Sequence, residues 1–142
     1  MSFRVVFDTN IIVSALIFSK ASLTWLRDSW ALETCIPIAS TETAQELLRV
    51  LNYPKFKLTI EEQTELLGEF LPYVESVVID TGVTGMLPEC RDYHDQKFLT
   101  LALSAKSKFL VTGDSDLLIL NNQVSFSIMT PSEFHEIIIN SR

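Results

Sequence analysis

Short, continuously apolar segments alternate along this chain with longer segments that have the periodicity of amphipathic helices. We expect strands over residues 3–7, 35–39, 74–79, 109–112 and 126–129, and helices over residues 11–17, 22–30, 41–51, 59–70, 94–105 and 131–139. Strands that are apolar on both faces are typical of a parallel sheet that helices cover on both sides. The alternation therefore predicts an α/β protein, namely a three-layer α/β/α sandwich around a mostly parallel sheet.

The length of 142 residues suits one compact domain, and we expect residues 1–142 to form it. Hydrophobic residues make up 47% of the chain, which argues against disorder. Two cysteines cannot form a disulfide framework, and the N-terminus lacks the apolar region of a signal peptide. No apolar run approaches the roughly 20 residues of a membrane span. We therefore expect a cytoplasmic protein that does not enter a membrane.

Two of the expected strands end in acidic residues. Asp8 follows residues 3–7 directly, and Asp114 and Asp116 follow residues 109–112 after one glycine. Because open α/β sheets bind ligands beyond the carboxyl ends of their strands, two central strands would bring Asp8 and Asp114 to the same edge. The alternative is that each acid only closes a turn or caps the next helix.

Asp95 lies in the first turn of the helix expected over residues 94–105. Its helical neighbours three, four and seven positions on are Phe98, Leu99 and Ala102, so the carboxyl group lies on the apolar face. A buried carboxylate is costly without a partner, and a bound cation would be such a partner. The alternative is that Asp95 interacts with the free amides of the helix N-terminus, with Asp92 as the cap.

Glu46 lies in the apolar helix expected over residues 41–51, and its spacing leaves its role open. It could close a capping box that begins at Thr43, or pair with Arg49 as a surface residue. Glu42, one turn earlier, is the acid most easily confused with it. His94 adjoins Asp95, and we interpret it as an ordinary surface histidine.

Several carboxylates without a cluster of histidines or cysteines suit a hard cation such as Mg²⁺ or Mn²⁺. The net charge of −7 opposes a generic nucleic-acid binder, but a divalent cation can supply the positive charge that a phosphate meets. Residues 49–57 contain Arg49, Lys55 and Lys57 around Tyr53 and Phe56. This segment could be a lip for single-stranded RNA or simply a solvated loop.

Four segments in order, residues 6–11, 46–48, 90–99 and 111–118, resemble the motifs of the PIN domain family. The closest resemblance is to its bacterial and archaeal branch, which includes toxins of type II toxin–antitoxin modules. The first and last segments contain Asp-Thr-Asn and Thr-Gly-Asp-Ser-Asp-Leu-Leu, which are fairly specific together. The resemblance implies a three-layer α/β/α fold and Mg²⁺- or Mn²⁺-dependent RNA cleavage that leaves a 5′-phosphate and a 3′-hydroxyl.

The resemblance also implies roles for individual residues. The four catalytic, metal-binding acids of the family correspond to Asp8, Glu46, Asp95 and Asp114. The supporting residues correspond to a further acid, Asp116, and to the small polar residues Thr9, Asn10 and Thr112. The branch often has an acid-rich Asp-Pro-Asp-Asp-Asp-Lys run, whereas residues 93–96 of this chain leave fewer acids, which puts a second metal site in doubt.

The carboxylate pattern and the resemblance together predict a metal-dependent endoribonuclease that hydrolyses single-stranded RNA. The resemblance further implies that the protein acts as the toxin of a pair and binds an antitoxin protein. One alternative is an inactive PIN-like scaffold that binds RNA or protein. Another is a receiver-like phosphoacceptor domain, although residues 126–130 lack the lysine that it would need. The large apolar residues within 25–32 and 66–71 could belong to the core, to a homodimer interface or to an antitoxin-binding groove.

Overall fold

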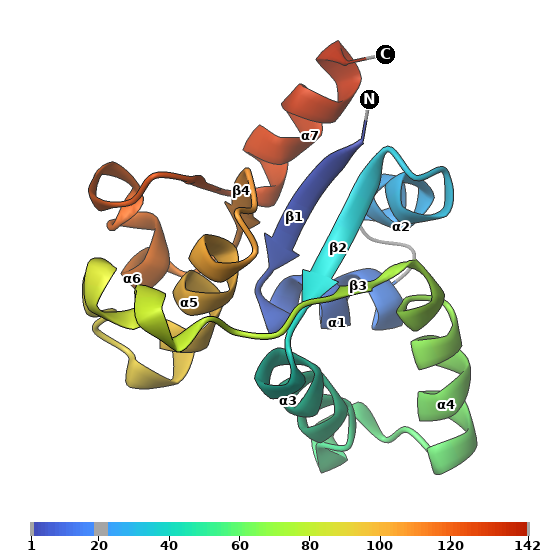
Figure 1. The fold of residues 1–142 in the computed structure, drawn as a ribbon. Coiled ribbons are helices and arrows are strands. Elements are labelled where there is room, and N and C mark those ends of the chain that lie inside the picture. The colour runs from blue at the N-terminus through green and yellow to red at the C-terminus, as the bar shows by residue number, and fades with distance from the viewer. Residues whose placement is uncertain (1, 19–22, 142) are drawn as a thin grey trace.

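The structure, a computed structural model, describes residues 2–18 and 23–141 and contains one five-stranded sheet (Figure 1). The strands are β1 (Phe3–Phe7), β2 (Cys35–Ala39), β3 (Glu75–Ser76), β4 (Phe109–Val111) and β5 (Ser127–Met129). Their order across the sheet is β3-β2-β1-β4-β5, and every pairing is parallel. A receiver domain has the order 2-1-3-4-5, so this topology excludes the receiver-like alternative.

The helices are α1 (Thr9–Ile17), α2 (Thr24–Ala31), α3 (Thr41–Leu51), α4 (Ile60–Gly68), α5 (Gln96–Ser104), α6 (Ser115–Leu118) and α7 (Pro131–Asn140). Three of them begin with capping boxes, whose first residues are Ser40, Thr59 and Thr130. Ser22, the expected start of the second helix, lies outside the described residues. The one-turn helix α6 was not predicted, because four residues are too few to show a helical period.

The sheet has helices on both faces, as expected for a three-layer sandwich. Phe3, Val5 and Phe7 of β1 pack into a cluster with apolar residues of α1, α2 and α7. Val6 points to the opposite face and packs with residues of α5 and α6. This alternation follows from the two-residue period of a strand, and it places β1 and β4 at the centre of the core.

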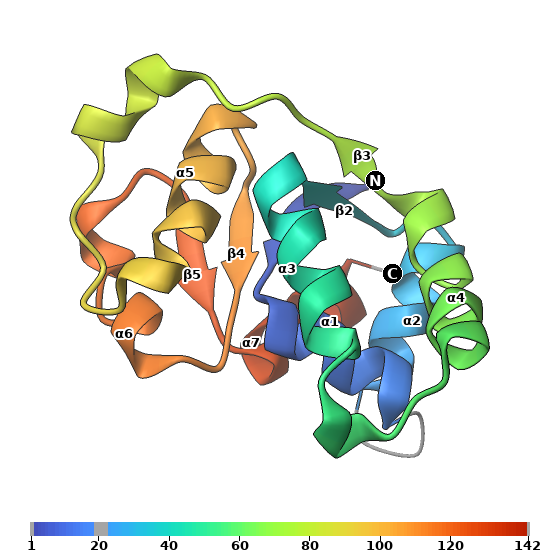
Figure 2. The same ribbon diagram turned by 90° about the horizontal axis from the view of Figure 1, so that it is seen from below.

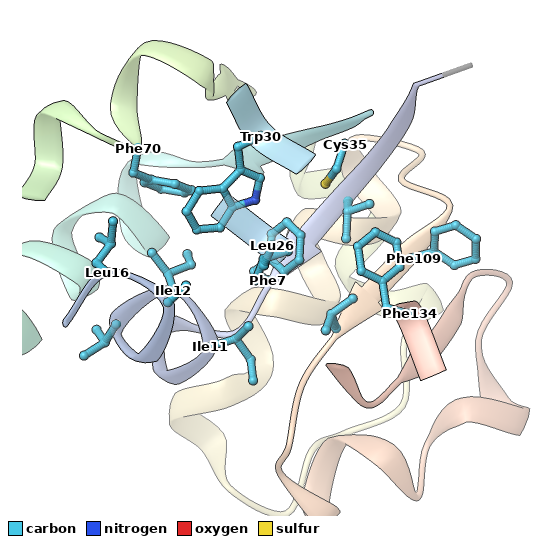
Figure 3. Close-up of a cluster of buried hydrophobic side chains, with 14 of the residues drawn as sticks. Phe7, Ile11, Ile12, Leu16, Leu26, Trp30, Cys35, Phe70, Phe109 and Phe134 are labelled. Atoms are coloured by element: carbon cyan, nitrogen blue, oxygen red, sulfur yellow. The ribbon is translucent and has the colours of Figure 1, made fainter. Parts of the chain in front are cut away.

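The first cluster combines aliphatic side chains with several aromatic rings (Figure 3). Trp30 is fully buried between Phe7 and Phe70, with ring centroids 6.0 and 4.7 Å away. Leu32 and Leu71, by contrast, are 73% and 46% exposed. The core interpretation is therefore correct for most of the apolar residues in 25–32 and 66–71, and a homodimer stays a prediction.

Figure 2 views the molecule from the side toward which β1 and β2 point in Figure 1. Here α3 contacts both α1 and α5, so that segments far apart in the sequence meet beyond the carboxyl ends of the central strands. The N-terminal end of β1 and the C-terminal end of α7 lie at the opposite end of the molecule. Within the described ranges, each helix falls short of the length and apolarity that crossing a bilayer would require.

Candidate functional site

Asp8 is held at the point where the two central strands end. Its backbone N–H donates to the Val111 carbonyl oxygen at 3.0 Å, which extends the pairing of β1 with β4 by one residue. One carboxylate oxygen accepts from the Asn10 N–H at 3.3 Å, and the other accepts from the Thr112 hydroxyl at 2.8 Å. Asp8 therefore caps α1, as the simpler alternative had it, and is also tied to the end of β4.

Thr112 connects this acid to the next one. Its buried hydroxyl donates to Asp8 and accepts from the Asp114 backbone N–H at 3.0 Å. The Asp114 carboxylate accepts from the Asp116 N–H at 2.9 Å and so caps α6. The two strand ends thus bring Asp8 and Asp114 to one edge of the sheet, with a threonine between them.

Asp95 occupies the N-cap position of α5 but makes no capping hydrogen bond through its side chain. Asp92 is the cap of the preceding 3-10 turn and accepts from the His94 N–H at 3.0 Å. The alternative is therefore correct for Asp92 as a cap, but wrong for Asp95, whose side chain makes no capping hydrogen bond. Its half-buried carboxyl group instead lies within hydrogen-bonding reach of Asp114.

Asp8 and Asp95 resist ionisation, because the pKa of each carboxyl group is raised in the folded chain. Burial, a hydrogen bond to Asp114, and the charges of Asp8 and Asp114 raise the pKa of Asp95 to about 7. Burial raises the pKa of Asp8 as well, against the hydrogen bonds from Thr112 and Asn10, which lower it. Near neutral pH the cluster therefore favours a neutralising proton or cation.

The negative charge of Glu46, unlike that of the other acids, is compensated by neighbouring cations. The Thr9 hydroxyl donates to one of its oxygens, and the Lys97 ammonium group lies 2.7 Å from the other. Arg49 lies 3.7 Å from the same oxygen and is largely exposed. The alternative of a capping box at Thr43–Glu46 is wrong, because the box of α3 joins Ser40 to Thr43.

Lys97 is the residue that sequence reasoning missed. Its side chain is only 15% exposed and joins α5 to Glu46 on α3. The signal was its position two residues after Asp95, within the segment 90–99 that carried the resemblance. Because residues two apart on a helix do not share a face, Lys97 can reach α3 while Asp95 faces Asp114.

The supporting residues lie close by but act partly through their backbones. Asn10 is exposed and contributes its backbone N–H to Asp8, whereas Thr9 orients Glu46. Asp116 is half-buried, and its carbonyl oxygen accepts from the Cys90 thiol at 3.6 Å.

Gln96 explains part of the departure from the acid-rich run of the family. Its side chain accepts from the Cys90 N–H at 2.7 Å and donates to the Pro88 carbonyl oxygen at 3.0 Å. An aspartate could accept but could not donate, so it could not make both bonds. Gln96 thereby fixes the segment that leads into Asp95.

The donor set suits a hard divalent cation. Carboxylate oxygens are the ligands that Mg²⁺ and Mn²⁺ prefer. Two of the four ion pairs among the described residues involve Glu46, and none involves Asp8, Asp95 or Asp114. In the part of the chain that the structure describes, no three acids, histidines or cysteines already have the geometry of a complete ligand set. The cluster therefore fits a divalent cation because its carboxylates lack a positively charged partner among residues 2–18 and 23–141. Binding of the cation would require Asp95 to release its proton.

Comparisons with known proteins agree with this architecture. A family model described as PIN domain matches residues 4–116. An uncharacterized protein of Methanocaldococcus jannaschii is 28% identical over 141 residues, which cover 94% of this chain and 90% of that protein. A chain in the crystal structure of VapBC2 from Rickettsia felis, bound to a DNA fragment from its promoter, has a similar fold with a TM-score of 0.64. That match has 16% identity and covers 90% of this chain and 98% of the other.

Proposed function

The chain belongs to the PIN domain family, and from this premise we propose that it is a Mg²⁺- or Mn²⁺-dependent endoribonuclease that hydrolyses single-stranded RNA. Proteins of this family are generally nucleases. The observation that carries the proposal is the uncompensated carboxyl cluster of Asp8, Asp95 and Asp114 at the ends of β1 and β4. We take residues 1–142 to be one catalytic domain.

In this proposal, Asp8, Asp95 and Asp114 would hold a divalent ion, and Glu46 would assist. When bound, such an ion would supply Lewis-acid chemistry for the phosphate and the attacking water. Thr112 holds Asp8 and Asp114 in fixed relative positions, because its hydroxyl group hydrogen-bonds to both residues. Glu46, oriented by Thr9 and Lys97, would direct the attacking water.

The reaction is a hydrolysis in which the water oxygen bonds to phosphorus while the bond from phosphorus to the 3′ oxygen breaks. The 3′ oxygen takes up a proton, so the products are a 5′-phosphate and a 3′-hydroxyl. Asp116, half-buried at the start of α6, donates its backbone N–H to the Asp114 carboxylate, and in this proposal its own carboxylate would assist a second ion or a water molecule.

The test is cleavage of a labelled single-stranded RNA by the purified protein with Mg²⁺, Mn²⁺, Ca²⁺ or EDTA. We expect cleavage with the first two ions, little with Ca²⁺ and none with EDTA. Asp8→Asn and Asp114→Asn should each lower kcat by about 100-fold or more, whereas Asp28→Asn, an exposed acid on α2, should keep full activity.

The second acid is tested by a matched pair on α3. Glu46→Gln should lower kcat more than Glu42→Gln, because Glu46 contacts Thr9 and Lys97 while Glu42 is exposed. If folded Asp8→Asn and Asp114→Asn proteins retain metal-supported cleavage, the carboxyl cluster is not the catalytic site. A folded wild-type protein that binds RNA but never cuts it would support the inactive scaffold instead.

We further propose that the chain is the toxin of a toxin–antitoxin pair, acts in the cytoplasm and binds an antitoxin protein. The fold similarity to a chain of the VapBC2 structure supports this reading. Expression of the chain alone should arrest growth, and co-expression of the neighbouring gene should relieve the arrest. Growth arrest by Asp8→Asn protein at equal abundance would contradict the assignment.

A further inference from the structure

A cavity of about 450 Å³ lies next to Glu46, between α3, α5 and the segment that includes residues 79–84. Its lining includes Glu42 and Arg49 of α3, Tyr93 and His94 of the turn before α5, and Lys97 of α5. Its volume is within the range of pockets that hold small ligands, about 300–1,000 Å³. Lys97 lines the cavity and also bonds Glu46, so the cavity adjoins the carboxyl site.

The charge of this cavity differs from that of the acid cluster. Arg49 and Lys97 face it along with one carboxylate, Glu42, in a chain whose net charge is −7. Arg49 is 62% exposed and pairs with Glu46 only at 3.7 Å. Such a long, exposed ion pair is weak, so the guanidinium group is available to bind a phosphate.

Tyr93 adds an aromatic surface to the same cavity. It is 83% exposed although its phenol ring is large and mostly apolar. The turn that carries it is fixed by the hydrogen bond from His94 to Asp92 and by the two bonds of Gln96. An exposed ring on a fixed turn, beside two cations, is the combination that binds single-stranded nucleic acids by base stacking and phosphate contact.

We propose that this cavity binds the nucleotide next to the scissile phosphate of single-stranded RNA. The base stacks on Tyr93, and the phosphate of that nucleotide meets Arg49 and Lys97. Lys97 thereby links the nucleotide pocket to Glu46 and the metal-binding acids. The inference rests on the proposed ribonuclease function. Of the residues considered for a lip in segment 49–57, Arg49 lines this cavity, whereas Lys55 and Lys57 do not.

The test is fluorescence anisotropy with a labelled, ten-nucleotide single-stranded RNA, on the Asp8→Asn background so that the RNA stays intact. Tyr93→Ala should weaken binding by about 5- to 150-fold, because stacking contributes about 1–3 kcal/mol per base. Tyr93→Phe should stay within about twofold. Arg49→Gln should weaken binding and reduce its dependence on salt.

Tyr53→Ala is the matched control, since Tyr53 is a half-exposed tyrosine of the alternative lip. It should leave affinity unchanged. If Tyr53→Ala weakens RNA binding and Tyr93→Ala does not, the inference is overturned. It is also overturned if duplex RNA binds as tightly as single-stranded RNA and its binding depends equally on Tyr93.

Kinetics of the active protein separate this inference from the proposed function. Tyr93→Ala should raise KM about as much as it weakens binding, with kcat within about threefold. If the protein cuts RNA and Tyr93→Ala changes neither KM nor affinity, the pocket is wrong and the nuclease stands. If Tyr93-dependent binding occurs but no divalent ion supports cleavage, the nuclease is wrong and the pocket stands.

Discussion

Replacing Asp95 with asparagine should stabilise the metal-free protein. The pKa of Asp95 is raised to about 7 in the folded chain, by burial, by the hydrogen bond to Asp114 and by the charges of Asp8 and Asp114. An aspartate in an unfolded chain has a pKa of about 3.9. The folded state therefore binds more protons than the unfolded state between these values, and the free energy of unfolding falls as pH rises from about 4 to about 7.

The size of this effect follows from the same pKa. Each pH unit corresponds to about 1.4 kcal/mol, so an unscreened group would cost about 4 kcal/mol above pH 7. Asp95 is only half-buried, and solvent screening reduces this to about 1–2 kcal/mol. Asparagine has the shape of the protonated acid and can still donate to Asp114, but it stays neutral at every pH.

The assay is urea unfolding of wild type and Asp95→Asn between pH 4 and pH 8 in EDTA, repeated with Mn²⁺. The variant should match wild type near pH 4 and be about 1–2 kcal/mol more stable at pH 8. Mn²⁺ should stabilise wild type by about 3 kcal/mol at a hundred times its dissociation constant, and the variant by much less. Asp28→Asn, which removes an exposed charge of the same sign from α2, should change neither result by more than about 0.5 kcal/mol.

Lower stability of Asp95→Asn in EDTA at pH 8 would refute the reasoning, because the carboxylate would then stabilise the fold as a cap or ion pair. Equal stabilisation of both proteins by Mn²⁺ would show that Asp95 does not hold the ion.

Two further predictions concern the hydrogen bonds of Thr112 at the site and the packing of Trp30 in the core. Thr112→Val should lower the free energy of unfolding by about 1–3 kcal/mol, since it leaves a buried hydrogen bond to Asp8 unmade, whereas Thr112→Ser should keep most of that stability in the same urea titration. Equal losses from both variants would mean that the methyl group, not the hydroxyl, matters. Trp30→Ala should cost about 3–5 kcal/mol because it empties the space between Phe7 and Phe70, while Leu32→Ala, at a 73% exposed position, should cost less than about 0.5 kcal/mol. A small loss from Trp30→Ala would instead favour a surface role for that region.

The sequence alone was enough to predict the features that depend on residues close to one another along the chain. The apolar runs indicated the strands, and the helical periodicity indicated helices over residues such as 41–51 and 131–139, which the structure contains as α3 and α7. Parallel strands all end at one edge of their sheet, so the order of elements already predicted that Asp8 and Asp114 would share an edge. The prediction failed where the signal was short: β3 has two residues rather than six, and α6 went unnoticed.

Tertiary structure alone decided which side chains face one another. Thr112 reaches Asp8 across 104 residues, and Lys97 reaches Glu46 across 51. Periodicity shows which face of its own helix or strand a residue occupies, but not which element packs against that face. The strand order brought β4 beside β1, and the packing of α5 against α3 paired Lys97 with Glu46. The perturbed carboxyl of Asp95 and the cavity at Tyr93 depend on those contacts, because desolvation and charge repulsion arise only once distant segments are packed together.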